Sequence, residues 1–233
     1  MGIHMIGIIG AMSVEIEEIE KGIMNKQKTV ISGIAFITGI YHGQDIVAAI
    51  CGMGKVYAAM CAQTMILKFS PSIIINVGVA GALSKNLKIG DIAIADDVVQ
   101  HDLDTSPLGN PVGMITGIDI VKIPCHRETA GLLKKCVDKL GIRSECGTIA
   151  SGDQFLNDDG NKNLVIGRFG AIACEMEGAS IGQVCYLNKV GFAVIRAISD
   201  GADGDSHTDF SQFLIQAVEN SSKVIDMFFA DLK

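Results

Sequence analysis

A series of short apolar runs, each followed by glycines, small polar residues or carboxylates, constrains this chain most. The runs show little alternation of apolar and polar side chains, a pattern typical of strands that are buried on both faces of a sheet. They cover residues 5–9, 46–51, 73–75, 92–99, 146–150, 171–174 and 192–198. Segments with the apolar spacing of a helix lie at 13–24, 55–69, 127–140, 178–188 and about 208–231.

This alternation predicts an α/β fold, a three-layer αβα sandwich around a central mixed, largely parallel sheet. The chain has 233 residues, of which 48% are apolar, and that is enough to bury a large core. No linker-like tract and no internal repeat divides the sequence. We therefore expect a single domain over residues 1–233.

Charge and cysteine usage exclude several classes of protein. The formal net charge is −7 without a cluster of basic residues, which argues against nucleic acid or an anionic membrane as the partner. The seven cysteines are odd in number and form no C-x-x-C pair, as expected for thiols in a reducing compartment. The N-terminus lacks the basic region and cleavage site of a signal peptide, so we expect a cytoplasmic protein.

The polar residues that could carry chemistry gather after the apolar runs. Ligands of open α/β sheets bind beyond the carboxyl ends of the strands, so these segments are the place to expect a site. Small residues and carboxylates dominate them. The segments are Gly10–Glu15, Cys51–Gly54, Gly78–Gly81, Ser151–Asp153, Glu175–Glu177 and Ser199–Asp200.

Several of these segments, taken alone, are better explained by structure than by function. Glu15 lies in the first turn of an acid-rich helix, where negative charge is favourable. The glycines of 52–54 and 78–81 match neither a P-loop nor a dinucleotide fingerprint and indicate tight turns. His101 and Asp102 have no second histidine at ligand spacing, which favours a loop over a metal site.

For other positions the structural and functional explanations both stay open. Arg196 interrupts an apolar run, where a charge is costly unless it is paired. Glu175 and Glu177 precede a helix, where acids are common. Asp200 follows Ser199 and precedes a glycine, so it can also be explained as a cap.

In their order along the chain, these segments resemble the motifs of 5′-methylthioadenosine/S-adenosylhomocysteine nucleosidases. The matching motifs are Gly7–Met12 with Glu15, Gly52–Lys55, Asn76–Gly81, Ser151–Phe155, Glu175–Glu177 and Arg196–Asp200. The resemblance spans about residues 5–231 and implies the nucleoside phosphorylase-like fold in a homodimer. An apolar patch on the helix at 56–69 is our expected dimer interface.

The resemblance also implies the reaction. The N-glycosidic bond of 5′-methylthioadenosine and S-adenosylhomocysteine, and of 5′-deoxyadenosine as well, would be hydrolysed to release adenine. Glu15 would activate the attacking water, and Asp200, placed by Ser199, would protonate purine N7. The partner is a small nucleoside, and no metal or organic cofactor is implied.

The remaining site residues are carried over from the same resemblance. Glu177 would hold the two ribose hydroxyls, with Met176 packed against the sugar. Phe155 would stack on adenine, and the backbone of Leu156 would pair with the edge of the base. Gly81 would line the base and sugar pocket, and Arg196 would lie behind the ribose. Met53 and Phe210 would face the 5′-alkylthio group.

Three alternative functions are weighed against this one. A purine nucleoside phosphorylase needs a phosphate pocket, usually built with arginines. Related phosphorylases carry Arg where this chain has Asn76, which favours water as the nucleophile. A hydrolase of aminodeoxyfutalosine-type nucleosides would share the site, and the sequence separates it poorly. A non-catalytic nucleoside-binding protein is disfavoured, because Glu15, Glu177 and Asp200 are all present.

Overall fold

A parallel set of strands forms the middle of the sheet in the structure, a computed structural model that describes residues 5–201 and 206–232 and, for 206–211, the backbone alone. Strand β1 (Ile6–Gly10) lies between β4 (Gln44–Ile50) and β5 (Ile73–Ala82), and β5 also pairs with β10 (Gly191–Asp200). Antiparallel pairing adds β3 (Ile34–Tyr41) and then β2 (Met24–Ile31) beyond β4.

At its other end the sheet closes on itself. Strand β10 pairs antiparallel with β6 (Ile92–Gln100), which continues in parallel to β8 (Ser144–Ser151) and then to β9 (Ala171–Glu175). Strand β9 in turn pairs antiparallel with the end of β5, where Gly81 lies opposite Cys174. A short strand, β7 (Lys122–Pro124), pairs with β6. The mixed sheet therefore contains a closed ring of strands that brings the ends of β5, β9 and β10 together.

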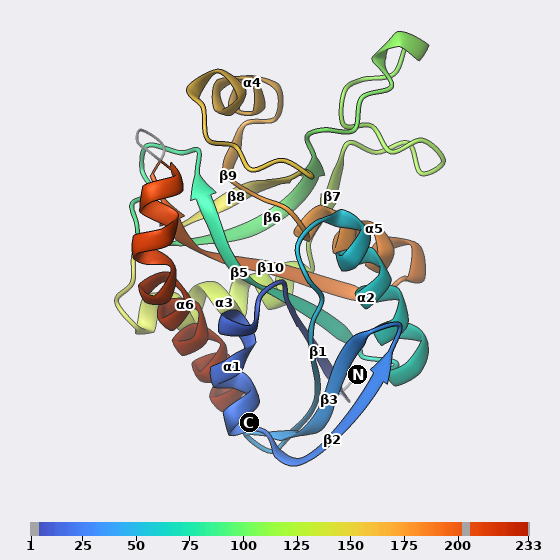
Figure 1. Ribbon diagram of the computed structural model, residues 1–233, viewed down its shortest axis with the longest axis vertical. Helices are drawn as coiled ribbons and strands as arrows, with labels where there is room; N and C mark the ends of the chain where they lie inside the picture. The colour runs from blue at the N-terminus through green and yellow to red at the C-terminus, as the bar shows by residue number, and fades with distance from the viewer. Residues whose placement is uncertain (1–4, 202–205, 233) are drawn as a thin grey trace.

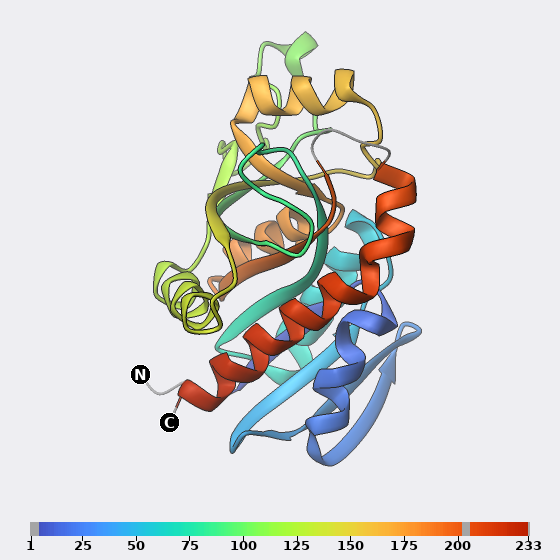
Figure 2. The same cartoon turned by 90° about the vertical axis from the view of Figure 1, so that its left-hand side faces the viewer.

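Helices cover both faces of the sheet (Figures 1 and 2). One face carries α1 (Ser13–Gly22), α3 (Arg127–Lys139) and α6 (Ser206–Asp231), and the other carries α2 (Lys55–Phe69) and α5 (Gly178–Asn188). Successive residues of β1 alternate between the two cores, since Ile8 faces the first and Ile9 the second. The three-layer arrangement expected from the sequence is confirmed.

Two further elements lie at the end of the molecule where the ring closes. Helix α4 (Asp159–Phe169) packs on β8 and β9, and a 3-10 turn (Ser106–Leu108) stands in the long loop between β6 and β7 (Figure 1). Among residues 5–201 and 206–232, no helix combines the length and the apolar character that crossing a membrane requires.

The structure corrects two expectations about the elements. Helix α1 ends at Gly22 rather than at residue 24, because Ile23 is extended and Met24 already begins β2. Most of β2 is exposed and polar, so no apolar run marks where this strand begins. Residues 78–81 form no turn, since β5 continues through them and stays paired with β10.

Helix α4 is the α-helix that sequence reasoning missed. It buries only Lys162, Val165 and Phe169, and its first turn is polar. A helix with so few apolar residues gives a weak periodic signal. Its local signal is the N-cap, since the Asp158 side chain accepts a hydrogen bond from the backbone N–H of Asn161 at 2.9 Å.

Candidate active site

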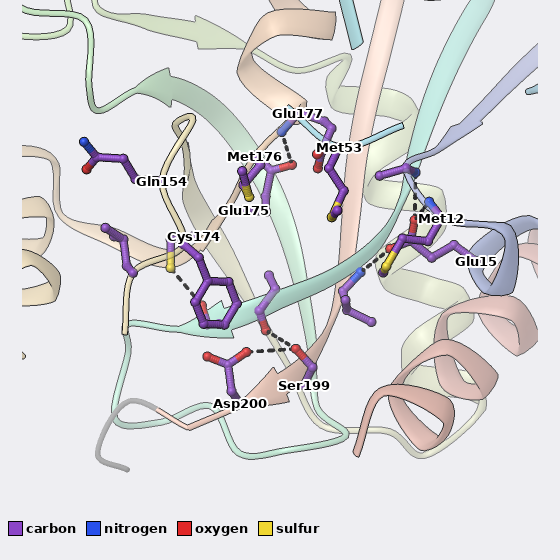
Figure 3. A pocket seen from close by; sticks show the side chains of 16 residues that line it. Met12, Glu15, Met53, Gln154, Cys174, Glu175, Met176, Glu177, Ser199 and Asp200 are labelled. Carbon is purple, nitrogen blue, oxygen red and sulfur yellow. Dashed lines mark hydrogen bonds between the residues drawn. The ribbon is translucent and has the colours of Figure 1, made fainter. Parts of the chain in front are cut away.

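A pocket opens where the last residues of β1, β5, β9 and β10 meet (Figure 3). Among the described residues that line it, none is a lysine, an arginine or a histidine. The lining consists of Ala11, Met12, Glu15, Met53, Val79, Ala80, Gly81, Gln154, Phe155, Leu156, Cys174, Glu175, Met176, Glu177, Ser199 and Asp200. In Figure 3, Glu15 and Asp200 lie at opposite ends of the pocket, and Glu177 lies on a third side.

Glu15 is held in a fixed orientation by backbone donors. Its Oε2 accepts hydrogen bonds from the N–H groups of Ala11 at 2.7 Å and Met12 at 2.8 Å, and its Oε1 accepts one from Val79 at 3.2 Å. Burial raises the pKa of Glu15 above its ordinary value, while Arg196 and the backbone donors act in the opposite direction. A buried carboxyl with a raised pKa and a fixed direction suits a base that takes a proton from water.

Arg196 lies behind the pocket and neutralises part of its acidic charge. Its Nη2 forms an ion pair with Glu175 and also contacts the side-chain oxygen of Asn76, while Nη1 donates to the Asn76 carbonyl at 3.2 Å. Glu177 Oε2 lies 4.0 Å from the same Nη2. The expectation that a charge inside this apolar strand must be paired is confirmed.

Glu175 is occupied by partners inside the protein. Besides Arg196, it contacts the hydroxyl of Ser151 and accepts hydrogen bonds from the backbone N–H groups of Glu177 at 3.1 Å and Gly178 at 2.8 Å. The last two contacts hold the start of α5 in place. Glu175 therefore fixes the local backbone that carries Glu177.

Glu177 faces the pocket from the start of α5. Its Oε1 accepts a hydrogen bond from the N–H of Gly54 at 2.8 Å, at the start of α2. Gly52 and Gly54 adopt positive φ angles of 92° and 97°, so the tight turn expected there is confirmed. Burial and the neighbouring charge of Glu175 raise the pKa of Glu177 to about 7, and Arg196 opposes that rise.

Asp200 ends β10 at the far side of the pocket. Ser199 Oγ donates a hydrogen bond to Asp200 Oδ1 at 2.9 Å (Figure 3). The adjacent β5 carries Gly81, where a Cβ atom would lie 2.7 Å from Asp200 Oδ2. Only a glycine at that position leaves the carboxyl where it is.

The rest of the lining is mostly apolar. Phe155 is 46% exposed, Leu156 is buried, and Met53 is 65% exposed. Burial raises the pKa of the Cys174 thiol to about 12, so Cys174 contributes a neutral surface rather than a nucleophile. A flat apolar ring fits such a wall.

The pocket brings together nearly all of the site residues expected from the sequence. Arg196 is the exception among the described side chains, since it lies behind the lining rather than in it. The side chain of Phe210 lies outside the described residues. Those in the lining are Glu15, Met53, Gly81, Phe155, Leu156, Met176, Glu177, Ser199 and Asp200.

Sequence reasoning assigned no part to several other lining residues. Met12, Gln154 and Ala80 lie inside or beside the motifs, so their position in the chain was a usable signal. Cys174 was taken for a buried apolar residue, although it directly precedes Glu175. The turn at His101 and Asp102 is connected to the start of α2, because Lys55 Nζ donates a hydrogen bond to Asp102 Oδ1 at 2.6 Å.

Comparisons with known proteins agree on one family. The chain matches the family model described as the phosphorylase superfamily over residues 5–230. The 5′-methylthioadenosine/S-adenosylhomocysteine nucleosidase of Shewanella halifaxensis is 37% identical over 222 residues, which cover 94% of this chain and 96% of that protein.

Solved structures give the same result. The nucleosidase of that kind from Neisseria meningitidis, in complex with methylthio-immucillin-A, superimposes with a TM-score of 0.95 at 30% identity, covering 98% of this chain and 100% of the other. The futalosine hydrolase of Helicobacter pylori strain 26695 superimposes with a TM-score of 0.92 at 35% identity, covering 98% of each chain.

Proposed function

The chain belongs to the phosphorylase superfamily, and from that membership we propose that it hydrolyses the N-glycosidic bond of 5′-methylthioadenosine and S-adenosylhomocysteine. 5′-Deoxyadenosine, which shares the adenine and ribose, is a further substrate. The products are adenine and the 5′-substituted ribose.

One observation carries this proposal. A single pocket holds Glu15 and Asp200 at opposite ends and Glu177 on a third side, and much of its remaining lining is apolar. A nucleoside presents groups that suit these partners, namely a flat base, a diol, and an anomeric carbon that joins the base to the diol-bearing sugar. Hydrolysis of a glycosidic bond by an acid and a base needs two carboxyls on opposite sides of that carbon.

The two end carboxyls divide the proton transfers. Water forms a bond to C1′ while the bond from C1′ to N9 breaks, and its proton passes to ionised Glu15. The electron pair of the broken bond stays on the purine, which becomes neutral adenine when Asp200 gives its proton to N7. The proton on Glu15 returns to Asp200 through solvent, so no net charge is left on the protein.

Glu177 and the apolar wall orient the substrate. Ionised Glu177 accepts hydrogen bonds from the two ribose hydroxyls, and such charge-assisted bonds are stronger than neutral ones. Phe155 stacks on adenine, the backbone of Leu156 meets the base edge, and Met176 packs on the sugar. A substrate held at base and diol presents C1′ to the water in line, which lowers the entropic part of the barrier.

Water rather than phosphate is the nucleophile in this proposal. Phosphate binding normally uses cationic side chains, whereas none lines the described part of the pocket. Arg196 is committed to Glu175 and to Asn76. A phosphate anion would also face the carboxyls of Glu15 and Glu177.

The active unit is a homodimer in the cytoplasm. Helices α2 and α5 lie side by side and expose a run of large apolar side chains that a second copy would cover. These are Val56, Tyr57, Leu67, Tyr186 and Leu187. All seven cysteines are free thiols, which suits a reducing compartment.

A second candidate is the hydrolysis of a futalosine-type nucleoside, because the Helicobacter pylori futalosine hydrolase superimposes with a TM-score of 0.92. The test is a competition in which 5′-methylthioadenosine, S-adenosylhomocysteine, 5′-deoxyadenosine and aminodeoxyfutalosine are mixed at equal concentration and the loss of each nucleoside is followed by mass spectrometry. The proposal expects the two thio-nucleosides to be consumed first. Preferential consumption of aminodeoxyfutalosine would replace it with the second candidate.

A further inference from the structure

Lys162 occupies a position in α4 that an apolar side chain would normally fill. It is 3% exposed and shares the buried face of the helix with Val165 and Phe169, three and seven residues further on. Removing an ammonium group from water is costly unless the protein compensates for it. The proposed reaction, as described above, makes no use of this cation.

One hydrogen-bond partner of Lys162 lies next to the proposed acid. Lys162 Nζ donates a hydrogen bond to the carbonyl oxygen of Gly201 at 3.0 Å, and Gly201 directly follows Asp200. The charges of Lys162 and Asp200 both act on the Cys174 thiol, one lowering its pKa and the other raising it. The ammonium is therefore bound to the residue that directly follows the Asp200 carboxyl at the end of β10.

The same lysine connects two parts of the site that come from distant places in the chain. Segment 152–158 carries Phe155 and Leu156 and leads directly into α4. Leu156 packs in one apolar cluster with Val165 of α4 and with Cys174. The bond from Lys162 to Gly201 ties this assembly to the end of β10.

We propose that Lys162 is a positioning residue for Asp200, which holds the end of β10 so that the carboxyl reaches purine N7. This inference rests on the function proposed above. Helix α4 would then contribute to protonation of the leaving group, in addition to following the segment whose Phe155 stacks on the base.

Two adenosine analogues separate this role from a general structural one. Methylthio-immucillin-A carries an N7–H that donates to the Asp200 carboxylate, whereas 5′-methylthiotubercidin carries carbon at position 7 and lacks that bond. Calorimetry gives the Kd of both for the full-length wild type and for Lys162→Met. The variant should bind methylthio-immucillin-A about tenfold more weakly, as expected when a charge-assisted hydrogen bond is misaligned, and methylthiotubercidin within about twofold of wild type.

Matched variants complete the experiment. Asp200→Asn should show the same selective loss for methylthio-immucillin-A in a stronger form, and Arg168→Met, which removes an exposed cation from the same helix, should change neither Kd. Lys162→Gln is made in parallel. The binding measurements use whichever Lys162 variant shows a cooperative thermal unfolding transition and is therefore folded. Equal weakening of both analogues, or of neither, would overturn the role of Lys162. Failure of the wild type to bind either analogue would instead count against the proposed function.

Discussion

A single buried guanidinium serves three carboxyls with different tasks. Glu175 takes the direct contact with Arg196, together with a hydroxyl and two backbone donors. The charge of Arg196 also lowers the pKa of Glu15 and of Glu177, although burial has the larger effect and raises the pKa of both. The residue that sequence reasoning placed near the ribose thus acts through charge, by keeping two nearby acids able to ionise.

The division of roles between the end carboxyls predicts two different inactive proteins. Glu15→Gln removes the base but keeps the size and shape of the side chain, so it should bind 5′-methylthioadenosine and turn it over about 10²–10⁴ times more slowly. Asp200→Asn removes the acid and should abolish turnover in a protein that still folds. Stopped adenine-release assays with circular dichroism as the fold control measure both effects, and near-normal turnover of either variant refutes the role of that residue.

The raised pKa of Glu177 predicts how stability changes with pH. Because its folded pKa of about 7 exceeds the unfolded value of 4.5, ionised Glu177 weighs against folding above pH 7, and this cost is relieved as the pH falls toward 4.5. Glu177→Gln should therefore stabilise the protein by about 1–3 kcal/mol at pH 8 and by much less at pH 5. Denaturant unfolding at the two pH values tests this, with exposed Glu219→Gln as control. An equal effect at both pH values would contradict the assignment.

At the scale of elements, β5 sets the shape of the site through two glycines. A Cβ at Gly78 would lie 2.6 Å from Glu15 Oε1, whereas a Cβ at Gly81 would lie 2.7 Å from Asp200 Oδ2. Neither glycine has a positive φ angle, so alanine can adopt the backbone conformation at both. The strand itself tolerates the change, and the displaced group is a carboxyl in each case.

Gly78→Ala and Gly81→Ala should each lower kcat by about 100-fold, since a displacement near 1 Å of a reacting group costs about that much. Gly131→Ala on α3 is the matched control, because no neighbouring atom lies within 4 Å of its added Cβ, and it should keep full activity. Steady-state kinetics together with melting curves separate lost activity from lost fold. Full activity of Gly78→Ala and Gly81→Ala would show that the carboxyls need no fixed position.

The strands and long helices of this fold were predictable, since their apolar patterns reflect burial within one element. Helix α2 was located to the residue at both ends, and the apolar strands differ from expectation only at their ends. The continuation of β5 through Gly78–Gly81 was not predictable, because pairing with β10 and then β9 keeps those glycines extended. Helix α4 is polar and packs on β8 and β9, and the apolar pattern of its own sequence does not predict these contacts.

The same distinction holds in the site. Glu15 and Asp200 lie in motifs that the resemblance covers residue by residue, and the structure places both in the lining of the pocket. The contact between Glu175 and Arg196 joins residues 21 apart on two strands, and the bond from Lys162 to Gly201 spans 39 positions. Such pairs arise from the closed ring of strands, which no local pattern in the sequence encodes.

For the whole molecule, the exposed apolar face of α2 and α5 predicts the oligomeric state. Val56 and Leu67 are 78% and 74% exposed, values that are unfavourable unless a partner covers them. Val56→Glu should convert the dimer to a monomer in sedimentation equilibrium, because a second copy would have to bury the new charge. Leu164→Glu on α4, also at an exposed apolar residue, should leave the dimer intact. A wild-type monomer would rule out this interface.

The identity of the nucleophile tests the account most directly. Purified protein is incubated with 5′-methylthioadenosine in ¹⁸O-labelled water, with and without phosphate, and both adenine and the sugar product are identified by mass spectrometry. Carboxyls line the pocket, and no cationic side chain is among its described lining residues. We therefore predict that adenine is released at the same rate with and without phosphate, and that the methylthioribose carries one ¹⁸O. Release that requires phosphate and yields a sugar 1-phosphate would contradict it and make the protein a phosphorylase.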